Sequence, residues 1–458
     1  MPPTSVEQLP SASRTVWRLA WPNIISNLLF TTVGFLHIKI VAQLGTNAVA
    51  AVTTGHRVFF LVQAILMGVS VAATAMIARA WGARQFARAE TITWTALSLA
   101  VGLAAIVSVP VVLAPEAIAG LFGLDARTTA MAGRFIFWLG LFNVFTAISM
   151  MLATALRAIG DVITPLWFLA CSSVLNVVCA WLLAYGIGPL PQLGVTGISL
   201  GGSAGASLVT SMFLLVWWRG HFKLKAIKRV GIHIPTARQL IDIGAPAVIE
   251  QGVIQLAFLG FFMIVAQYGT EPFAAYGIGI SLVAFSIVIG FGFGIATATL
   301  VGQQLGAGKP DRAILVTSRS LRMALLAMTF LSIVLASFAE SLAHFMIDDQ
   351  EVIELTVIFI YVIAIAQPLM AFEFTLSGAL RGAGDTRAPL IATFCGIIFG
   401  RLIPALVCLW LDLPVQYVFA VMLLDYAIKT TLLLRRFRSR KWLDISFEPA
   451  DSNRSRHL

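Results

Sequence analysis

The chain has 458 residues, of which 59% are hydrophobic and only 11% are charged, and its formal net charge is +10. A soluble protein carries about 25% charged residues, so this chain has too little charge to cover a surface that faces water. Composition therefore excludes a soluble protein and indicates an integral membrane protein, and the basic balance is more typical of cytoplasmic loops than of nucleic-acid binding.

Apolar segments of membrane-spanning length recur along nearly the whole chain, which predicts helices rather than barrel strands and leaves no soluble domain. We predict twelve spans, near residues 16–42, 48–78, 91–113, 129–156, 163–186, 195–218, 240–266, 273–303, 315–339, 352–380, 388–411 and 415–435.

Lysine and arginine gather in alternate loops. Five basic residues lie between Arg219 and Arg229, and five more between Arg435 and Lys441, whereas the loop after the ninth span is acidic. The excess of positive charge on the cytoplasmic side predicts that both termini are cytoplasmic. We expect a multi-pass protein of the cell membrane, which is the inner membrane in a Gram-negative cell.

The chain contains an internal duplication, so its second half repeats the pattern of its first half. Pro246 follows Pro22 by 246 − 22 = 224 residues, and the same offset carries ALRAIGDVITPL (155–166) onto ALRGAGDTRAPL (379–390). Each half has six spans and starts on the same side, so the repeat is parallel, and the substrate route is expected between the halves. The predicted parts are a cytoplasmic N-terminal segment (1–15), an N-lobe (16–218), a basic cytoplasmic linker (219–239), a C-lobe (240–435) and a basic cytoplasmic tail (436–458).

Three motifs carry a family resemblance: LVGQQLGAGKPDRA (300–313), a GT-x-x-x-AA turn after the first and seventh spans, and ALRGAGDTRAPL. Together they resemble the multidrug and toxic compound extrusion (MATE) family. The resemblance covers about residues 16–436. It implies two six-helix lobes in a V shape and a secondary antiporter that exports organic compounds in exchange for inward H+ or Na+. The expected partners are a small organic substrate, the ion and the lipid bilayer, with H+ favoured over Na+, no cofactor or metal, no nucleic acid, and a monomer.

The repeated motif residues have a structural interpretation. Glycine permits a tight turn in ALRAIGD and ALRGAGD, and Arg157 with Asp161, like Arg381 with Asp385, can pair there. Pro22 and Pro246 lie inside predicted helices, where proline bends the axis. We expect these residues to form hinges and loop contacts rather than to bind substrate.

Three ionisable residues lie at membrane depth in the second half: Glu250, Glu373 and Arg401. Such groups cost about 2.5–3.5 kcal/mol on insertion scales, which makes each a functional hypothesis. A carboxyl group there can hold a proton in one state and release it in another. We predict Glu250 as the principal H+ or Na+ site, Glu373 as its partner and Arg401 as a counter-charge. The alternative is a static pair of Glu373 with Arg401 that fixes helix register.

The first half departs from the family pattern. Many bacterial members carry an aspartate where His37 stands, and another where Ala180 follows Asn176. The first half instead carries His37, Lys39, His56 and Arg57. Either the histidines titrate near neutral pH and favour an anionic or zwitterionic substrate, or Lys39 reaches the interface and the histidines are neutral cavity residues.

Two alternatives to an antiporter stay open. One is a flippase or exporter for an anionic, lipid-linked or organic-acid substrate, which the cationic first half fits. The other is a non-transporting membrane scaffold, which would not need Glu250 and Glu373. An enzyme is not expected, because GAGKP (306–310) lacks the full phosphate-loop pattern and no catalytic triad is apparent.

Overall fold

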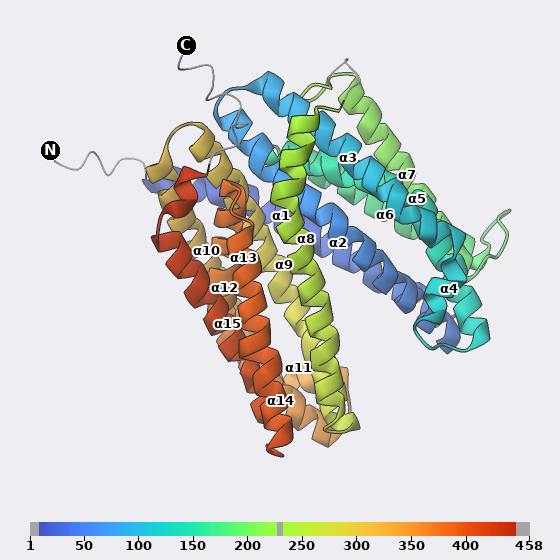
Figure 1. The fold of residues 1–458 in the computed structure, drawn as a ribbon. Helices are drawn as coiled ribbons and strands as arrows, with labels where there is room; N and C mark the ends of the chain where they lie inside the picture. Colours follow the sequence, from blue (N-terminus) through green and yellow to red (C-terminus); the bar gives the residue numbers. More distant parts are fainter. Residues whose placement is uncertain (1–8, 227–231, 446–458) are drawn as a thin grey trace, which may run out of the picture. The chain divides into compact units, whose positions relative to one another are not determined.

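The computed structural model describes residues 9–226 and 232–445. Parts of the predicted N-terminal segment, linker and tail lie outside these residues. The described chain contains helices and no strand, and twelve of its helices are long and apolar enough to cross a membrane, as predicted (Figure 1).

The first half of the chain contains seven helices. Their bounds are α1 (Leu9–Ala42), α2 (Thr46–Gly82), α3 (Phe86–Leu113), α4 (Pro115–Gly120), α5 (Ala126–Ala158), α6 (Ile163–Tyr185) and α7 (Val195–Trp218).

The second half repeats this order. Its bounds are α8 (Ile234–Ala266), α9 (Thr270–Gly306), α10 (Pro310–Ser337), α11 (Ala339–Met346), α12 (Gln350–Ala383), α13 (Arg387–Cys395), the π-helix η2 (Gly396–Leu402), α14 (Ile403–Trp410), α15 (Val415–Arg438) and the 3-10 helix η3 (Lys441–Asp444). The span Arg387–Trp410 is thus built from α13, η2 and α14 in succession.

The ends of the helices follow the turn chemistry of the sequence. Gly160 and Gly384 adopt φ values of 91° and 90°, in the left-handed region that favours glycine. The next residue then caps the following helix: Asp161 accepts from the backbone N–H of Thr164 at 3.1 Å, and Asp385 from that of Ala388 at 3.3 Å. The two copies of the ALR motif therefore make the same turn.

The chain divides into two compact units, and the divisions fall inside helices. The first unit takes the residues up to Ile24 and those from Ile249 onward, and the second takes Ile25 to Val248. Each division lies just after a proline, Pro22 in α1 and Pro246 in α8. Proline removes a backbone hydrogen bond from a helix interior. Thus α1 and α8 each change unit beside the residue that weakens their hydrogen bonding.

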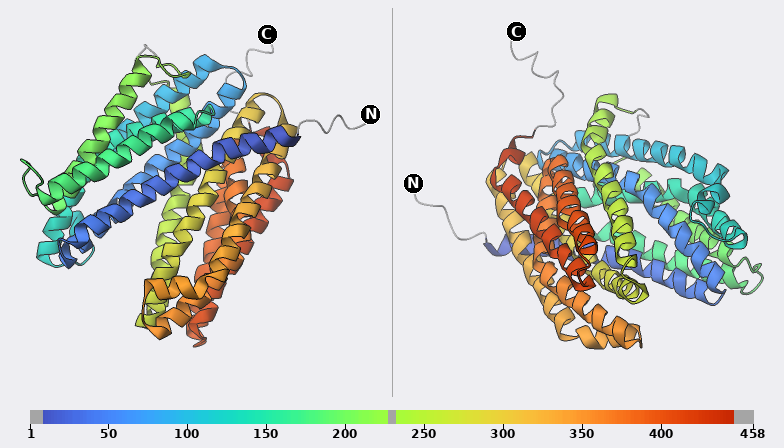
Figure 2. Two further views of the ribbon diagram at one scale, coloured as in Figure 1. Left: turned by 180° about the vertical axis from the view of Figure 1, so that it is seen from behind. Right: turned by 60° about the horizontal axis from the view of Figure 1, so that its bottom comes forward.

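The first unit is a bundle in which α12 is central. It packs along α9, α10 and α15, and η2 and α13 pack on α15 (Figures 1 and 2). A cluster of buried aromatic rings (Phe261, Tyr276, Phe359 and Phe419) fills the bundle between α8, α9, α12 and α15. Aromatic side chains bury large apolar areas, so this cluster contributes strongly to the packing of the four helices.

The second unit is the corresponding bundle of the first half. Its α5 packs along α2, α3 and α7, and α6 lies along α7 (Figure 2). Gly197, Gly201 and Gly205 place the backbone of α7 directly against Leu175, Cys179 and Leu183 of α6. Small residues at this spacing allow the close helix approach that is common in membranes.

The closest helix approach in the first unit depends on glycine. A Cβ atom on Gly382 would collide with the backbone of Ala298, and one on Gly378 with the backbone of Gly294. Since a backbone atom cannot swing aside, Gly382→Val should separate α9 from α12 and cost about 1–3 kcal/mol. The check is the thermal unfolding midpoint in detergent. Gly102→Ala on α3, where a Cβ meets open space, is the control and should leave the midpoint unchanged; equal midpoints for both variants would contradict the prediction.

Candidate functional site

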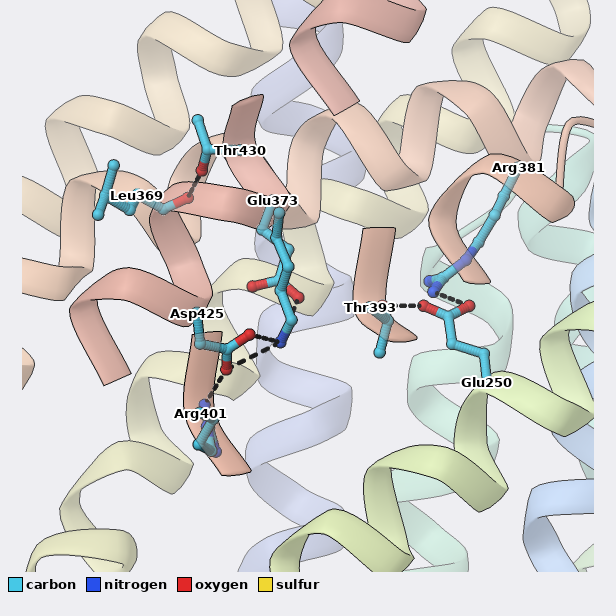
Figure 3. A network of polar contacts seen from close by, with 9 residues as sticks. Glu250, Leu369, Glu373, Arg381, Thr393, Arg401, Asp425 and Thr430 are labelled. Atoms are coloured by element: carbon cyan, nitrogen blue, oxygen red, sulfur yellow. Dashed lines mark hydrogen bonds and ion pairs between the residues drawn. The ribbon is translucent and has the colours of Figure 1, made fainter. Parts of the chain in front are cut away.

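The first unit buries two groups of charges inside its membrane-spanning helices. The Glu250 triad comprises Glu250 on α8, Arg381 on α12 and Thr393 on α13. The Asp425 network comprises Asp425 and Lys429 on α15, Arg401 on η2 and Glu373 on α12. Figure 3 shows the two groups in one view, with Glu250, Arg381 and Thr393 together and Glu373, Asp425 and Arg401 together.

The carboxylate of Glu250 has a partner for each oxygen. Its Oε2 lies 2.8 Å from Nη2 of Arg381, and its Oε1 accepts a hydrogen bond of 2.8 Å from Oγ1 of Thr393 (Figure 3). The residue is 2% exposed. Hydrogen bonds to an ionised group are the stronger kind, so these two contacts hold the side chain of Glu250 in place. The triad also ties three helices together through one side chain.

Asp425 is the centre of the second group and is completely buried. Arg401 approaches its Oδ2 to 2.5 Å, and Nζ of Lys429 lies 3.1 Å from its Oδ1. Both cations also face aromatic rings: the guanidinium of Arg401 lies 5.8 Å from the ring centres of Phe261 and Tyr426. Cation–π contacts of this kind are strongest where water is excluded. Asp425 therefore balances two cations at once.

Local backbone geometry makes room for Asp425. Gly396 and Gly400 both lie in the π-helix, and a Cβ atom on either would collide with Asp425. A π-helix inserts a residue into the helical repeat and is frequent at functional sites. Here it carries Arg401, so the irregular turn both admits the carboxylate and supplies its counter-ion.

Glu373 is the least satisfied carboxylate of the three. Its Oε1 lies 3.5 Å from Nζ of Lys429, the longest of the ion pairs in either group. Its Oε2 is buried, and no hydrogen-bond partner reaches it from the described residues. An oxygen that is buried without a donor costs free energy in the ionised form, so Glu373 is the carboxyl group in these two groups best placed to accept a proton.

The second unit holds a different polar cluster, built on histidine. Nε2 of His37 on α1 lies 2.8 Å from Oδ1 of Asn176 on α6, and since Oδ1 only accepts, Nε2 carries the hydrogen. The rings of His37 and His56 stack with centroids 5.7 Å apart. Nδ1 of His37 and Nε2 of His56 are buried and have no hydrogen-bond partner among the described residues. We call His37 and His56 the histidine pair.

The family of the chain follows from comparison with known proteins. The MatE family model matches residues 22–182 and matches again over residues 246–406. The chain belongs to the MATE family. The two matches are the two repeats seen in the sequence, and the described chain has the twelve membrane-spanning helices expected of a multi-pass transporter rather than an enzyme.

Several curated proteins resemble the chain over most of its length. A probable multidrug resistance protein NorM of Thermotoga maritima is 27% identical over 95% of this chain and 94% of its own. An FAD transporter of Shewanella oneidensis is 24% identical over 84% of this chain and 85% of its own. Multidrug resistance protein NorM of Burkholderia vietnamiensis is 28% identical over 84% of this chain and 86% of its own.

Two solved structures share the fold. The Vibrio cholerae MATE transporter VcmN in its bent form gives a TM-score of 0.85 at 18% identity, covering 95% of this chain and 99% of its own. A transporter from Pyrococcus furiosus, described as a MOP superfamily member with a binding pocket of reverse polarity, gives 0.88 at 17% identity, covering 97% of this chain and all of its own.

The ion pairs of the second-half site residues differ from the pairs that the sequence analysis predicted. Arg401 pairs with Asp425 and not with Glu373, so the static pair of Glu373 with Arg401 is not formed. Arg401 is a counter-charge, but its partner is a carboxylate that the sequence analysis did not name. Glu250 and Glu373 lie in separate groups rather than sharing a partner. Arg381 and Asp385 do not pair with each other, because Arg381 reaches Glu250 and Asp385 reaches Arg436 at 2.6 Å. In each case the partner comes from another helix.

In the first half, the structure separates the four cationic or titratable residues. His37 and His56 come together with Asn176, but Lys39 and Arg57 are exposed side chains. Arg157 lies in the last turn of α5, and Asp161 lies in the turn that follows, where it caps α6. Pro22 and Pro246 are both inside helices, as the sequence predicted.

Sequence reasoning missed Asp425, Lys429 and Thr393. Asp425 and Lys429 are charged residues four positions apart inside a predicted span, a spacing that places both on one face of a helix. That pattern was a usable signal. Thr393 offers none, because a threonine in an apolar span commonly bonds the preceding turn of its own helix.

The buried pair of Glu250 and Arg381 can be tested by a mutant cycle. Glu250→Gln leaves the guanidinium of Arg381 without its anion and should cost on the order of 3 kcal/mol of stability. Adding Arg381→Met to Glu250→Gln should recover part of that loss, because it removes the unpaired charge. Thermal unfolding in detergent measures both, and Arg57→Met, at an exposed side chain, is the control. Strictly additive losses would refute a direct pair.

Proposed function

We propose that this MATE transporter is a secondary antiporter that exports organic compounds and takes in H+ or Na+ through the buried carboxylates of its C-lobe. The observation that carries the proposal is the pair of charge groups in membrane-spanning helices of the first unit. Ionisable groups at this depth are costly and mark ion pathways. The NorM relatives named as multidrug resistance proteins support export of organic compounds.

Glu250 and Glu373 have different tasks in this proposal. Glu250 is fully partnered by Arg381 and Thr393, so it holds α8 against α12 and α13 until the ion binds. Glu373 has a buried oxygen with no partner among the described residues, so it is the first acceptor for the ion. Neutralising Glu373 weakens its pull on Lys429, which changes the contact between α12 and α15.

The two prolines provide a means of linking ion binding to movement. Glu250 lies on α8 just after Pro246, at the division between the compact units. A change in the Glu250 triad therefore acts beside the point where the helix is least supported by its own hydrogen bonds. We propose that the lobes rock about these positions, with both termini in the cytoplasm.

The test is proton movement in liposomes that trap a pH-sensitive dye. When a cationic dye substrate is added, wild type should move protons. Glu250→Gln and Glu373→Gln should each lower the rate of proton movement by tenfold or more, which corresponds to a rise of about 1.4 kcal/mol in the activation free energy for each factor of ten. Glu354→Gln, an exposed carboxylate on the same helix as Glu373, is the matched control. Proton release that survives both substitutions would reject the C-lobe site.

A second candidate function is export of an organic anion. His37 stands where many family members carry an aspartate, and with His56 it forms a pair that can become positive beside Asn176. An FAD transporter is among the relatives. The Pyrococcus structure described by its reverse pocket polarity has the same fold. A protonated imidazole attracts anions and can donate from both nitrogens.

The second candidate predicts a substrate-specific effect of the histidine pair. In the same liposomes, His37→Leu should reduce transport of a flavin nucleotide by roughly tenfold, since one charge-assisted hydrogen bond contributes about 1.5–3 kcal/mol. Transport of the cationic dye should be unchanged. Lys39→Met, at an exposed position nearby in sequence, is the control. If the flavin nucleotide is not transported by wild type, or if both substrates lose transport equally, this candidate is excluded.

A further inference from the structure

The ammonium group of Lys429 lies among carboxylate oxygens inside the membrane-spanning part of the first unit. Its Nζ is 3.1 Å from Oδ1 and 3.3 Å from Oδ2 of Asp425, and 3.5 Å from Oε1 of Glu373. The face of the Tyr426 ring lies 5.2 Å from it. The lysine side chain is 6% exposed. Lys429 thus occupies the position that a free cation would take among these oxygens.

The charges of the two groups in the first unit are balanced without any bound ion. Three carboxylates face three cations, and each carboxylate has at least one cationic partner within 3.5 Å. The carboxylates are those of Glu250, Glu373 and Asp425, and the cations are Arg381, Arg401 and Lys429. A cation entering from water therefore finds no uncompensated negative charge.

H+ and Na+ make different demands on such a network. Hard metal cations need several oxygen ligands at once, and here the oxygens of Asp425 and Glu373 already surround Nζ of Lys429. A proton needs one lone pair and almost no volume. The buried Oε2 of Glu373 offers that lone pair, because no donor reaches it from the described residues.

We propose that Lys429 is a built-in cation that excludes Na+ from the Asp425 network and thereby makes H+ the coupling ion. The inference rests on the proposed function, in which the C-lobe carboxylates couple transport. The proton comes from a hydronium ion: one of its O–H bonds breaks, an O–H bond forms at Oε2 of Glu373, and a water molecule is left. Asp425 is then the only anionic neighbour of the Lys429 ammonium in the network, so the contact between Lys429 and Glu373 weakens.

The surroundings of Glu373 support this assignment. The charged groups that act on it are Lys429 and Asp425 from α15, Arg401 from η2 and Glu250 from α8. Arg401 is committed to Asp425 at 2.5 Å, and Glu250 is committed to Arg381 at 2.8 Å. Lys429 is therefore the only cation within 4 Å of Glu373 among the described residues.

The experiment compares Na+ with N-methylglucamine at equal ionic strength on the detergent-solubilised chain. Wild type should show the same unfolding temperature in both. Lys429→Met leaves Glu373 without a cation and frees the oxygens around Nζ, so Na+ should raise its unfolding temperature by about 2–4 °C through binding to the folded state. Lys429→Arg keeps the charge and should show no shift. Lys39→Met, at an exposed lysine of α1, should also show none.

A second variant covers the case in which Lys429→Met does not fold. Combining it with Glu373→Gln restores charge balance, so the double variant should fold and should be insensitive to Na+. A wild-type chain that Na+ stabilises, or a folded Lys429→Met variant that it does not, would overturn the inference.

The liposome assay separates the inference from the proposed function. If Na+ stabilises Lys429→Met but neither Glu250→Gln nor Glu373→Gln alters transport, the carboxylates do not couple transport, and Lys429 still excludes Na+ from them. If wild type moves protons without Na+ and the folded Lys429→Met variant ignores Na+, coupling stands and the role given to Lys429 is wrong. Na+-driven transport by Lys429→Met would support both.

Discussion

The arrangement of the first unit depends on the rule that a charge inside a membrane needs a partner. Removing one member of a buried ion pair leaves an uncompensated charge and costs about 3–5 kcal/mol. The chain meets this requirement with contacts between helices: Glu250 of α8 reaches α12 and α13, and Asp425 of α15 reaches η2. The same contacts that make the charges tolerable also join different helices, so a change of protonation is also a change of packing.

Backbone irregularities lie where these charges need space. The π-helix places Gly396 and Gly400 against Asp425: a Cβ atom on Gly396 would collide with the carboxylate, and one on Gly400 with the backbone of Asp425. Pro246 lies shortly before Glu250 in α8, at the division between compact units. Each irregularity weakens regular helix hydrogen bonding, which is a cost in stability, and each is beside a group on which the proposed coupling depends.

The two repeats use one scaffold for different polar chemistry. The ALR motif makes the same left-handed turn and the same aspartate cap in both halves. By contrast, Glu250 and Glu373 correspond to Ser26 and Ser149 at the repeat offset, and the first half has the histidine pair instead. The buried charges of the first unit balance one another, whereas the second unit holds the histidine pair, in which one ring nitrogen of each histidine has no hydrogen-bond partner among the described residues. This asymmetry is why a coupling ion and an organic anion can be assigned to different lobes.

The amino-acid sequence by itself determined the membrane class, the twelve spans, the duplication and the position of Glu250 and Glu373 inside spans. Hydropathy and internal repetition are read directly along the chain, so they require no knowledge of which helices pack together in space. It also placed the glycine turns, because only glycine adopts their φ values freely. Tertiary structure alone decided the partners: Arg401 with Asp425, Arg381 with Glu250, and Lys429 between Asp425 and Glu373. An ion pair requires that the charged nitrogen and oxygen atoms lie within about 4 Å of each other. Side chains on different helices reach that distance only after the helices have packed.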